Sequence, residues 1–227
     1  VQAGSQEGGL VGHIVIAAQL CDDYPVSPFV DAGPCTYAEL KDLIIRRNRA
    51  VLMRVAIHGL RQRYQYDGCP YISRSKCRNV KNAVLDNGRI LSADYLETTI
   101  TDIDFCIILD TYDFDDFVCL QAAHAKYGPL PEQLKEVTRE YFRRKTALKG
   151  VEGSELEYGN AKALLNAIYG CSAQDPVKED IIYKDKMFEE DETPLAQLLG
   201  ESNKKAWQPY QWGVWITARA REALQAC

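Results

Sequence analysis

The stretch from Glu157 to Gly170 constrains the fold of this chain most, because its apolar residues recur at the spacing of an α-helix. Ala161, Leu164, Leu165 and Ile168 share one face at 3.6 residues per turn. Gly170 stands where helices commonly stop, since glycine adopts the left-handed conformation of the C′ position without a steric penalty. We therefore expect an amphipathic helix over 157–170.

A second face of this helix carries Lys162, Asn166 and Tyr169, spaced i, i+4 and i+7. One cation, one amide and one aromatic ring in a column suit a nucleotide: the ammonium neutralises phosphate, the amide forms hydrogen bonds, and the ring packs on a base or sugar. The plainer alternative is a solvated lysine and a half-buried tyrosine on an ordinary amphipathic helix. The column alone favours that plainer reading.

A longer helix is expected before it, over 131–149, because Pro131 fits the first turn of a helix and Gly150 interrupts the pattern. About ten residues separate the two segments, so they are expected to form an antiparallel helical hairpin. The first helix carries much of the positive charge of the hairpin, in Arg139, Arg143, Arg144, Lys145 and Lys149.

Charge is strongly segregated along the chain, although the net charge is only −5. Residues 43–85 hold ten Lys and Arg against one acid, whereas residues 94–116 hold eight acids and no Lys or Arg. Such segregation favours basic surfaces that a phosphate backbone can follow, flanked by acidic surface. Ordinary solvated faces remain the alternative.

Eight cysteines are scattered without a C-x-x-C pair, which argues against a zinc or redox motif and for buried thiols in a reducing cytosol. No apolar run reaches the length of a membrane-spanning helix, and the first residues lack the pattern of a signal peptide. We expect no membrane association.

Local patterns predict the remaining elements. Thr36 to Glu39 has capping-box spacing and should open a helix through about Asn48. Asn87-Gly88 predicts a two-residue hairpin turn, because a type I′ turn needs positive φ at both positions. Further strands are expected at 10–20, 50–57 and 103–109, and further helices at 114–127 and 218–226. Residues 175–203 are expected to be irregular with one short helix, and 209–217 to be a strand or a strand-to-helix junction.

Lys162-Ala-Leu-Leu-Asn-Ala-Ile-Tyr-Gly170 resembles the fingers-helix motif of family B DNA polymerases, in the bacteriophage, protein-primed branch. Other segments resemble parts of that family in the same order: 22–29 the segment after the first palm motif, 75–77 and 87–94 the insertion typical of the branch, 141–149 the outgoing fingers helix, and 209–221 the re-entry into the palm. The resemblance covers nearly the whole chain.

The resemblance implies roles for individual residues. Lys145, Lys162, Asn166 and Tyr169 would bind the incoming nucleotide. The DNA-binding set would be Arg143, Arg144, Lys149, Gly170, Thr217 and Arg221. The implied partners are a DNA primer-template and a dNTP, with a terminal protein primer or the remaining polymerase domains as further partners. The implied setting is the cytoplasm of a bacterial host cell, with a phage or prophage origin.

The resemblance also implies an α+β fold: a small antiparallel sheet subdomain, a two-helix fingers hairpin and a partial polymerase palm. The expected segments are a lead-in with palm remnant at 1–35, a basic insertion with the β-hairpin at 36–128, the fingers at 129–170, a second insertion at 171–209 and palm re-entry at 210–227.

The departures from the family concern metal binding. The family reaction uses Mg²⁺ held by carboxylates of two palm motifs. Residues 12–20 pass through the place of the first motif without its aspartate, and the second motif would follow Arg221, where no match occurs before Cys227. The sequence thus assigns no catalytic and no metal-binding residue, and a fragment inactive by itself is expected. The alternative is a polymerase-derived module that binds DNA or another protein without catalysis.

Asp102 and Asp104 raise the alternative of a different class of enzyme, a sugar-nucleotide transferase. Alternate carboxylates on a strand are a weak metal-binding pattern of sugar-nucleotide transferases, with Asp113, Asp115 and Asp116 nearby. Such carboxylates more often face water. His13, His58 and His124 are isolated in sequence and are expected to be structural.

Overall fold

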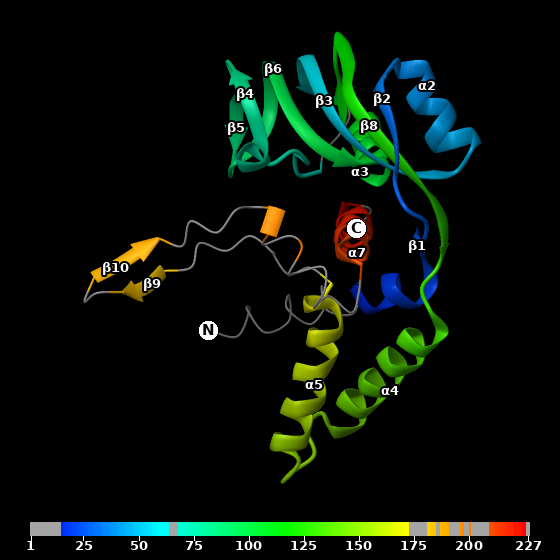
Figure 1. Cartoon of the computed structure of the whole chain (residues 1–227), viewed down its shortest axis with the longest axis vertical. Coiled ribbons are helices and arrows are strands. Elements are labelled where there is room, and N and C mark those ends of the chain that lie inside the picture. The colour runs from blue at the N-terminus through cyan, green and yellow to red at the C-terminus, as the bar shows by residue number, and fades with distance from the viewer. Residues whose placement is uncertain are drawn as a thin grey trace. The chain divides into compact units, whose positions relative to one another are not determined.

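The computed structural model describes residues 15–63, 68–172, 181–184, 187–190, 196–197, 200 and 209–225 (Figure 1). Two compact units divide the chain: residues 1–135 together with 215–227, and residues 136–214. The first unit contains a curved sheet with helices, and the second contains most of a helical hairpin. Each unit is described by itself.

The first unit is built on an antiparallel sheet in which eight strands pair among the described residues. The main order is β1-β8-β3-β6-β4, with β2 beside β8, β5 beside β6 and β7 beside β3. The strands are β1 (Asp23–Pro25), β2 (Val30–Cys35), β3 (Arg49–Gln62), β4 (Cys77–Lys81), β5 (Val84–Asp86), β6 (Arg89–Thr101), β7 (Tyr112–Asp113) and β8 (Asp116–Pro129). The longest strands, β3, β6 and β8, form the centre of the sheet.

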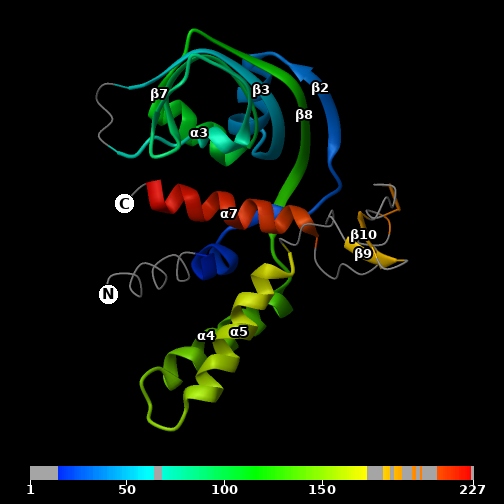
Figure 2. The same cartoon turned by 90° about the vertical axis from the view of Figure 1, so that its left-hand side faces the viewer.

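Alternation along β3 explains which face of the sheet is covered. Val51, Met53, Val55 and Ile57 are buried, whereas Leu52, Arg54 and His58 are exposed. Figure 2 shows helix α3 (Asp102–Thr111) lying within the curve of the sheet. Phe105 and Ile108 of α3 are fully buried, so the core of the unit lies between α3 and the concave face of the sheet.

The first unit has further helical segments besides α3. Helix α2 (Tyr37–Lys41) continues into the π-helical turn η1 (Asp42–Arg46), and the ring of Tyr37 meets that of Phe105 edge-on at 6.0 Å. The short 3-10 turn η2 (Arg74–Lys76) precedes β4. Helix α7 (Tyr210–Gln225) begins in the second unit and belongs to the first from Trp215 onward.

Two local predictions are confirmed in this unit. Thr36 accepts a hydrogen bond from the Glu39 amide while the Glu39 carboxylate accepts one from the Thr36 amide, so the capping box opens α2. Asn87 and Gly88 join β5 to β6 with φ of 46° and 76°, as a tight hairpin turn requires. The α+β class is confirmed as well.

The strand expected at 103–109 is wrong, because these residues form α3. Thr101 and Asp104 make a second capping box, which starts a helix in an apolar run that reads equally well as a buried strand. Seven of the ten residues of α3 are buried and they lie on more than one side of the helix, so the run carries no amphipathic period that distinguishes a helix from a strand.

The helix expected at 114–127 is also wrong, because most of that stretch belongs to β8. Phe117, Cys119, Ala122 and Ala125 are buried at intervals of two, three and three residues. The register between β3 and β8 shifts between the pairs Arg54–Gln121 and Val55–Cys119, so a β-bulge accounts for the first interval of three and breaks the period of two that would indicate a strand.

Two further expectations fail at the ends of the chain. The described part of the strand expected at 10–20 is helical, over 15–21, and residues 10–14 lie outside the described residues. Residues 210–217 are the first half of α7 rather than a strand or a strand-to-helix junction, and the helix expected at 218–226 is its continuation.

The second unit contains most of α4 (Glu132–Leu148) and all of α5 (Glu155–Gly170), which confirms the helical hairpin expected from the sequence. Both views show the two helices running side by side from the turn that joins them (Figures 1 and 2). A separate antiparallel pair, β9 (Ile181–Lys184) and β10 (Met187–Glu190), replaces irregular structure expected there. The rest of 175–203 is largely outside the described residues.

In the described part of the chain, no helix is long and apolar enough to cross a membrane.

Candidate functional site

The exposed face of α5 presents the two described members of the predicted column. Ala161, Leu165 and Ile168 are buried, and Lys162 and Asn166 follow the first two of them by one residue. One residue turns a helix by about 100°, so the column lies beside the buried stripe, where Lys162 and Asn166 are exposed. The side chain of Tyr169 lies outside the described residues.

Gly170 ends α5 without the left-handed conformation expected of a C′ glycine. Its φ is not positive, and the next amide, of Cys171, still donates a helical hydrogen bond of 2.9 Å to Ala167. A Cβ at Gly170 would meet no atom of the described residues within 4 Å. Neither backbone conformation nor crowding within this structure therefore demands glycine here.

The turn between the two helices is fixed by its backbone. Gly150 and Gly153 have φ of 77° and 81°, which side-chain-bearing residues rarely adopt. The Ser154 hydroxyl lies 3.0 Å from the Leu148 carbonyl and 2.7 Å from the Val151 carbonyl, in hydrogen-bonding position to the end of α4. This turn sets the direction in which α5 leaves α4.

The cations of α4 fall into two electrostatic classes. Arg143 and Arg144 both pair with Glu140, the latter at 2.6 Å, and their hydrogen bonds, led by that of Arg144, lower the pKa of Glu140. Lys145 instead lies over the ring of Phe142, 5.7 Å from its centroid, and Lys149 is exposed at the start of the turn. Neither Lys145, Lys149 nor Lys162 has an ion-pair partner among the described residues.

The two lysines at 145 and 162 stand on different helices of one hairpin, on accessible parts of its surface. Unpaired ammonium groups of this kind are able to neutralise phosphate oxygens, and an exposed amide such as Asn166 adds hydrogen bonds. Ammonium groups cannot hold a metal cation, because like charges repel.

Thr217 and Arg221, the two remaining members of the predicted set, lie on α7 in the first unit. Thr217 is half-buried. The Arg221 guanidinium forms an ion pair of 2.7 Å with Asp104 and donates a hydrogen bond of 2.9 Å to the Tyr71 hydroxyl. Burial works to raise the pKa of Asp104, but Arg221 and the hydrogen bonds of Tyr71 and Thr101 outweigh it and hold that pKa below its usual range.

Asp102, the other carboxylate of the sequence pair, is engaged differently. Its oxygens accept hydrogen bonds from the Val51 amide at 3.1 Å, the Tyr127 hydroxyl at 2.5 Å and the Trp215 indole at 3.2 Å. Burial raises the pKa of Asp102, although the hydrogen bonds from Tyr127 and Val51 act to lower it. Both aspartates thus start α3 and tie it to β3, β8 and α7, rather than standing on a strand toward water.

No group of three or more His, Cys, Asp and Glu side chains with the arrangement of a metal site occurs in the described ranges. The donors around Asp102 and Asp104 are N–H and O–H groups, which occupy the lone pairs that a metal ion would need. The described residues therefore do not fit the Mg²⁺ that the resemblance implies.

Sequence reasoning missed the two clusters that tie α7 to α3. They bring Trp215 to Asp102 and Arg221 to Asp104 across more than a hundred residues of sequence. The capping box at Thr101 was the one local signal for Asp104. His58 meets the Tyr95 ring at 4.8 Å on the exposed face of the sheet, and His13 lies outside the described residues.

No sequence family and none of the curated proteins matches this chain. Solved structures of Phi29 DNA polymerase do match it in fold. The ternary complex of that polymerase with primer-template DNA and incoming nucleotide substrates matches with a TM-score of 0.64 and 17% identity over 94% of this chain. The post-translocation binary complex with primer-template DNA gives the same TM-score and identity, and the complex with single-stranded DNA gives a TM-score of 0.62.

The chain spans about a third of the length of that polymerase. The likeness establishes that this chain has the fold of part of Phi29 DNA polymerase, a protein-primed family B enzyme.

Proposed function

We propose that this chain is part of a DNA-directed DNA polymerase, in which the α4–α5 hairpin binds the triphosphate of an incoming dNTP and the adjoining primer-template. The observation that carries the proposal is the fold shared with Phi29 DNA polymerase, combined with the Lys162–Gly170 motif on a helix whose Lys162 and Asn166 are exposed. Either one alone is weaker, because fold does not imply function and an exposed lysine is commonplace.

The unpaired lysines carry the nucleotide-binding part of the proposal. Lys162 and Lys145 neutralise triphosphate oxygens, Asn166 adds a hydrogen bond, and Tyr169 packs against the sugar or base. Arg143 and Arg144 of α4, by contrast, exchange Glu140 for DNA phosphate, so their contribution is reduced by the loss of those ion pairs.

The DNA-binding part rests on Arg143, Arg144, Lys149, Gly170, Thr217 and Arg221. Gly170 offers backbone without a side chain, and no atom of the described residues lies within 4 Å of the place a Cβ would take, so a nucleic acid is able to approach there. Arg221 is already held by Asp104 and Tyr71, which favours a role in orienting α7 beside any DNA contact it makes.

Mg²⁺, when bound, supplies charge neutralisation at the reacting phosphate and activation of the primer hydroxyl. Since the described residues do not fit it, the role assigned to this chain is binding and positioning. Carboxylates from another segment or another chain would complete the reaction in the whole polymerase.

Binding of a fluorescent dNTP at low salt tests the proposal. We expect Lys162→Ala to weaken binding about tenfold, as the loss of roughly 1.5 kcal/mol from one charge-assisted hydrogen bond implies. The loss should shrink as salt is raised.

Lys126→Ala is the matched control, because Lys126 is an exposed lysine on β8 of the first unit. It should leave the affinity for the dNTP unchanged. Equal affinities of the Lys162→Ala variant and the parent protein would reject the assigned role.

Primer extension with Mg²⁺ or Mn²⁺ separates binding from catalysis. We expect no extension by this chain alone, and nucleotide and DNA binding by the same preparation. Vigorous template-directed synthesis by the isolated polypeptide would contradict the assignment of binding and positioning only.

A further inference from the structure

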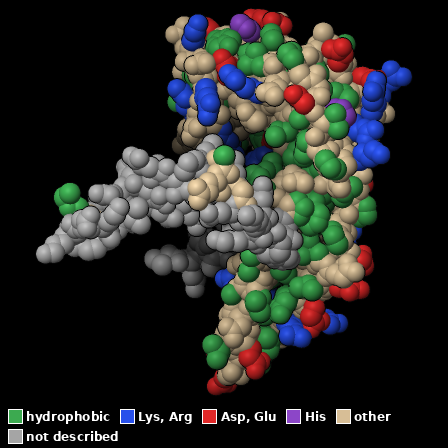
Figure 3. Space-filling model, in the orientation of Figure 1, with side chains coloured by type: hydrophobic (Ala, Val, Ile, Leu, Met, Phe, Trp, Pro, Cys, Tyr) green, Lys and Arg blue, Asp and Glu red, His purple; other side chains and the backbone are tan. Residues whose placement is uncertain are grey.

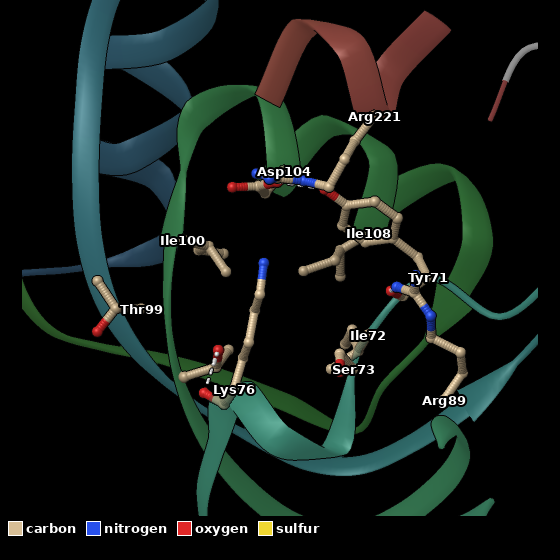
Figure 4. Close-up of a pocket in the computed structure, with 11 residues that line it drawn as sticks. Tyr71, Ile72, Ser73, Lys76, Arg89, Thr99, Ile100, Asp104, Ile108 and Arg221 are labelled. Carbon is tan, nitrogen blue, oxygen red and sulfur yellow. Dashed lines mark hydrogen bonds and ion pairs between the residues drawn. The ribbon is translucent and has the colours of Figure 1, made fainter. Parts of the chain in front are cut away.

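A small pocket in the first unit is lined by three cationic side chains from three different elements. Lys76 comes from η2, Arg89 from the start of β6 and Arg221 from α7, and the pocket has a volume of about 70 Å³ (Figure 4). Lys76 and Arg89 both remain exposed in part, so the pocket is open to a ligand arriving from solvent. Arg221 is more than a hundred residues from the other two in sequence, and the fold brings it to them.

The charges around this pocket do not cancel. Asp104 is the one acid in its lining, and it is fully engaged: one oxygen accepts from Arg221 and Tyr71, and the other accepts from the amide and hydroxyl of Thr101. Arg221 therefore balances Asp104. Lys76 and Arg89 are left without an acid of their own in the lining of this pocket.

Arg89 is positioned by one hydrogen bond, of 2.6 Å from its guanidinium to the Tyr71 carbonyl, which leaves further N–H donors. The ammonium of Lys76 extends into the pocket toward the ion pair of Asp104 and Arg221 (Figure 4). It has no hydrogen-bond or ion-pair partner among the described residues. Burial, and then the charge of Arg221, lower the pKa of Lys76, so the ammonium is held where an anion would relieve its environment.

The apolar walls of the pocket strengthen the attraction between its cations and an anion. Ile72, Ile100 and Ile108 line the pocket beside the cations and are buried. Electrostatic attraction is stronger next to such apolar surface than in open water. The Ser73 side chain stands at the same pocket and is able to donate a hydrogen bond.

We propose that this pocket binds a single phosphoryl group, held by Lys76 and Arg89 with Arg221 as the third cation. A volume of about 70 Å³ is several times the roughly 10–15 Å³ that a cavity needs to hold one water molecule, so the pocket has room for one tetrahedral oxyanion. A second pocket of about 280 Å³ shares Tyr71, Arg89 and Arg221 with the first. The remainder of an organic phosphate has room there, against Pro70 and Leu224.

This site lies wholly within the first unit and uses no residue of α4 or α5. It shares only Arg221 with the proposed function, so its tests rely on Lys76 and Arg89. Three ligands distinguish the source of the phosphoryl group: inorganic phosphate, a deoxynucleoside monophosphate, and a short single-stranded oligonucleotide.

The test follows the side-chain Cε resonance of Lys76 by NMR while each ligand is added to the full chain. We expect a saturable shift and a raised pKa of Lys76, because a bound anion stabilises the ammonium. Saturation by phosphate alone assigns a free-anion site. Saturation only by the monophosphate assigns an organic phosphate that uses both pockets, and saturation only by the oligonucleotide assigns a backbone phosphate.

Lys76→Gln should weaken binding of whichever ligand saturates the site at least tenfold, measured by calorimetry, and Arg89→Gln should do the same. Lys81→Gln is the control, because Lys81 lies on the next strand, exposed over the Tyr95 ring and outside the pocket. Lys162→Ala should leave the Lys76 resonance and its response unchanged, which keeps this site distinct from the hairpin.

Absence of a saturable response to all three ligands would overturn the proposal. An equal loss of affinity in Lys76→Gln and Lys81→Gln would overturn it too, since it would indicate diffuse attraction. A thermal unfolding scan of each variant without ligand checks that the chain still folds, and Lys76→Arg, which keeps the charge, should retain most of the binding.

Discussion

Individual polar residues decide how the first unit closes. The Arg221–Asp104 pair and the Trp215–Asp102 hydrogen bond fasten α7 to the start of α3. From the sequence, Arg221 was predicted to contact DNA and the two aspartates were only a weak metal pattern. A buried carboxylate is stable only when donors satisfy it, and donors over a hundred residues away in sequence have no local signature. The DNA contact of Arg221 stays a prediction.

Glu97 offers a test of stability against pH at the residue scale. Its carboxylate accepts hydrogen bonds from Arg54 at 2.7 Å, Asn79 at 2.8 Å and Tyr95 at 2.9 Å, which lower its pKa to about 2 from its usual 4.5. Because the pKa of Glu97 is lower in the folded chain than in the unfolded chain, the ionised carboxylate stabilises the fold. This stabilisation is complete above about pH 4.5 and is lost as the pH falls toward 2. Urea unfolding should therefore show a shallower loss of stability over that range in Glu97→Gln than in the parent.

Glu157→Gln is the comparison, since Glu157 is exposed on α5 and has no ion pair among the described residues. Its pH profile should follow the parent. If Glu97→Gln retained the slope of the parent between pH 4.5 and 2, the hydrogen-bonded carboxylate would not be a source of acid lability.

At the scale of elements, the sequence predicts best where one face of an element is clearly covered. The two helices of the hairpin, the capping box of α2 and the Asn87–Gly88 turn follow local rules. The stretches at 103–109 and 114–127 exchange their expected types, because the first is buried on all sides and the second contains a bulge and three alanines. Tertiary contacts, rather than local propensity, decide both.

Neighbouring leucines on α5 test whether its buried stripe holds the hairpin together. Leu165 is 4% exposed and Leu164 is 47% exposed. Leu165→Ala should destabilise the second unit by about 2–5 kcal/mol, as for other buried leucines, and Leu164→Ala by less than about 1 kcal/mol. Hydrogen exchange of the α5 amides measures this directly.

One result would contradict the predicted difference between Leu165→Ala and Leu164→Ala. If Leu164→Ala accelerated exchange as much as Leu165→Ala, the covered stripe of α5 would extend to Leu164, contrary to the exposure of Leu164 in the structure.

At the scale of the whole molecule, the fold was predictable in class and in its resemblance, but not in its pairing. The Lys162–Gly170 motif and its companions indicated a polymerase-like chain, and the match in fold to Phi29 DNA polymerase supports that indication over 94% of the chain. Strand order depends on partners separated by long stretches, such as β1 with β8, and no local signal in the sequence identifies such partners. The sequence does not predict the cationic pocket either, because its lining comes from several separate elements.

Charge segregation leads to a prediction about DNA binding by the chain as a whole. A net charge of −5 opposes binding at long range, so affinity must come from a few local phosphate contacts. Replacing Arg143, Arg144 and Lys149 together by alanine should reduce the slope of log K against log salt by about two to three, since each phosphate contact contributes about 0.7 to 0.9.

The matched control replaces Lys41, Arg46 and Arg47 by alanine, which removes an equal charge. Both of these arginines pair with Asp42, as Arg143 and Arg144 pair with Glu140. The control should leave the slope nearly unchanged. Fluorescence anisotropy with a labelled primer-template at several salt concentrations measures both slopes, and equal reductions in the two triple variants would mean that DNA responds to net charge rather than to the hairpin.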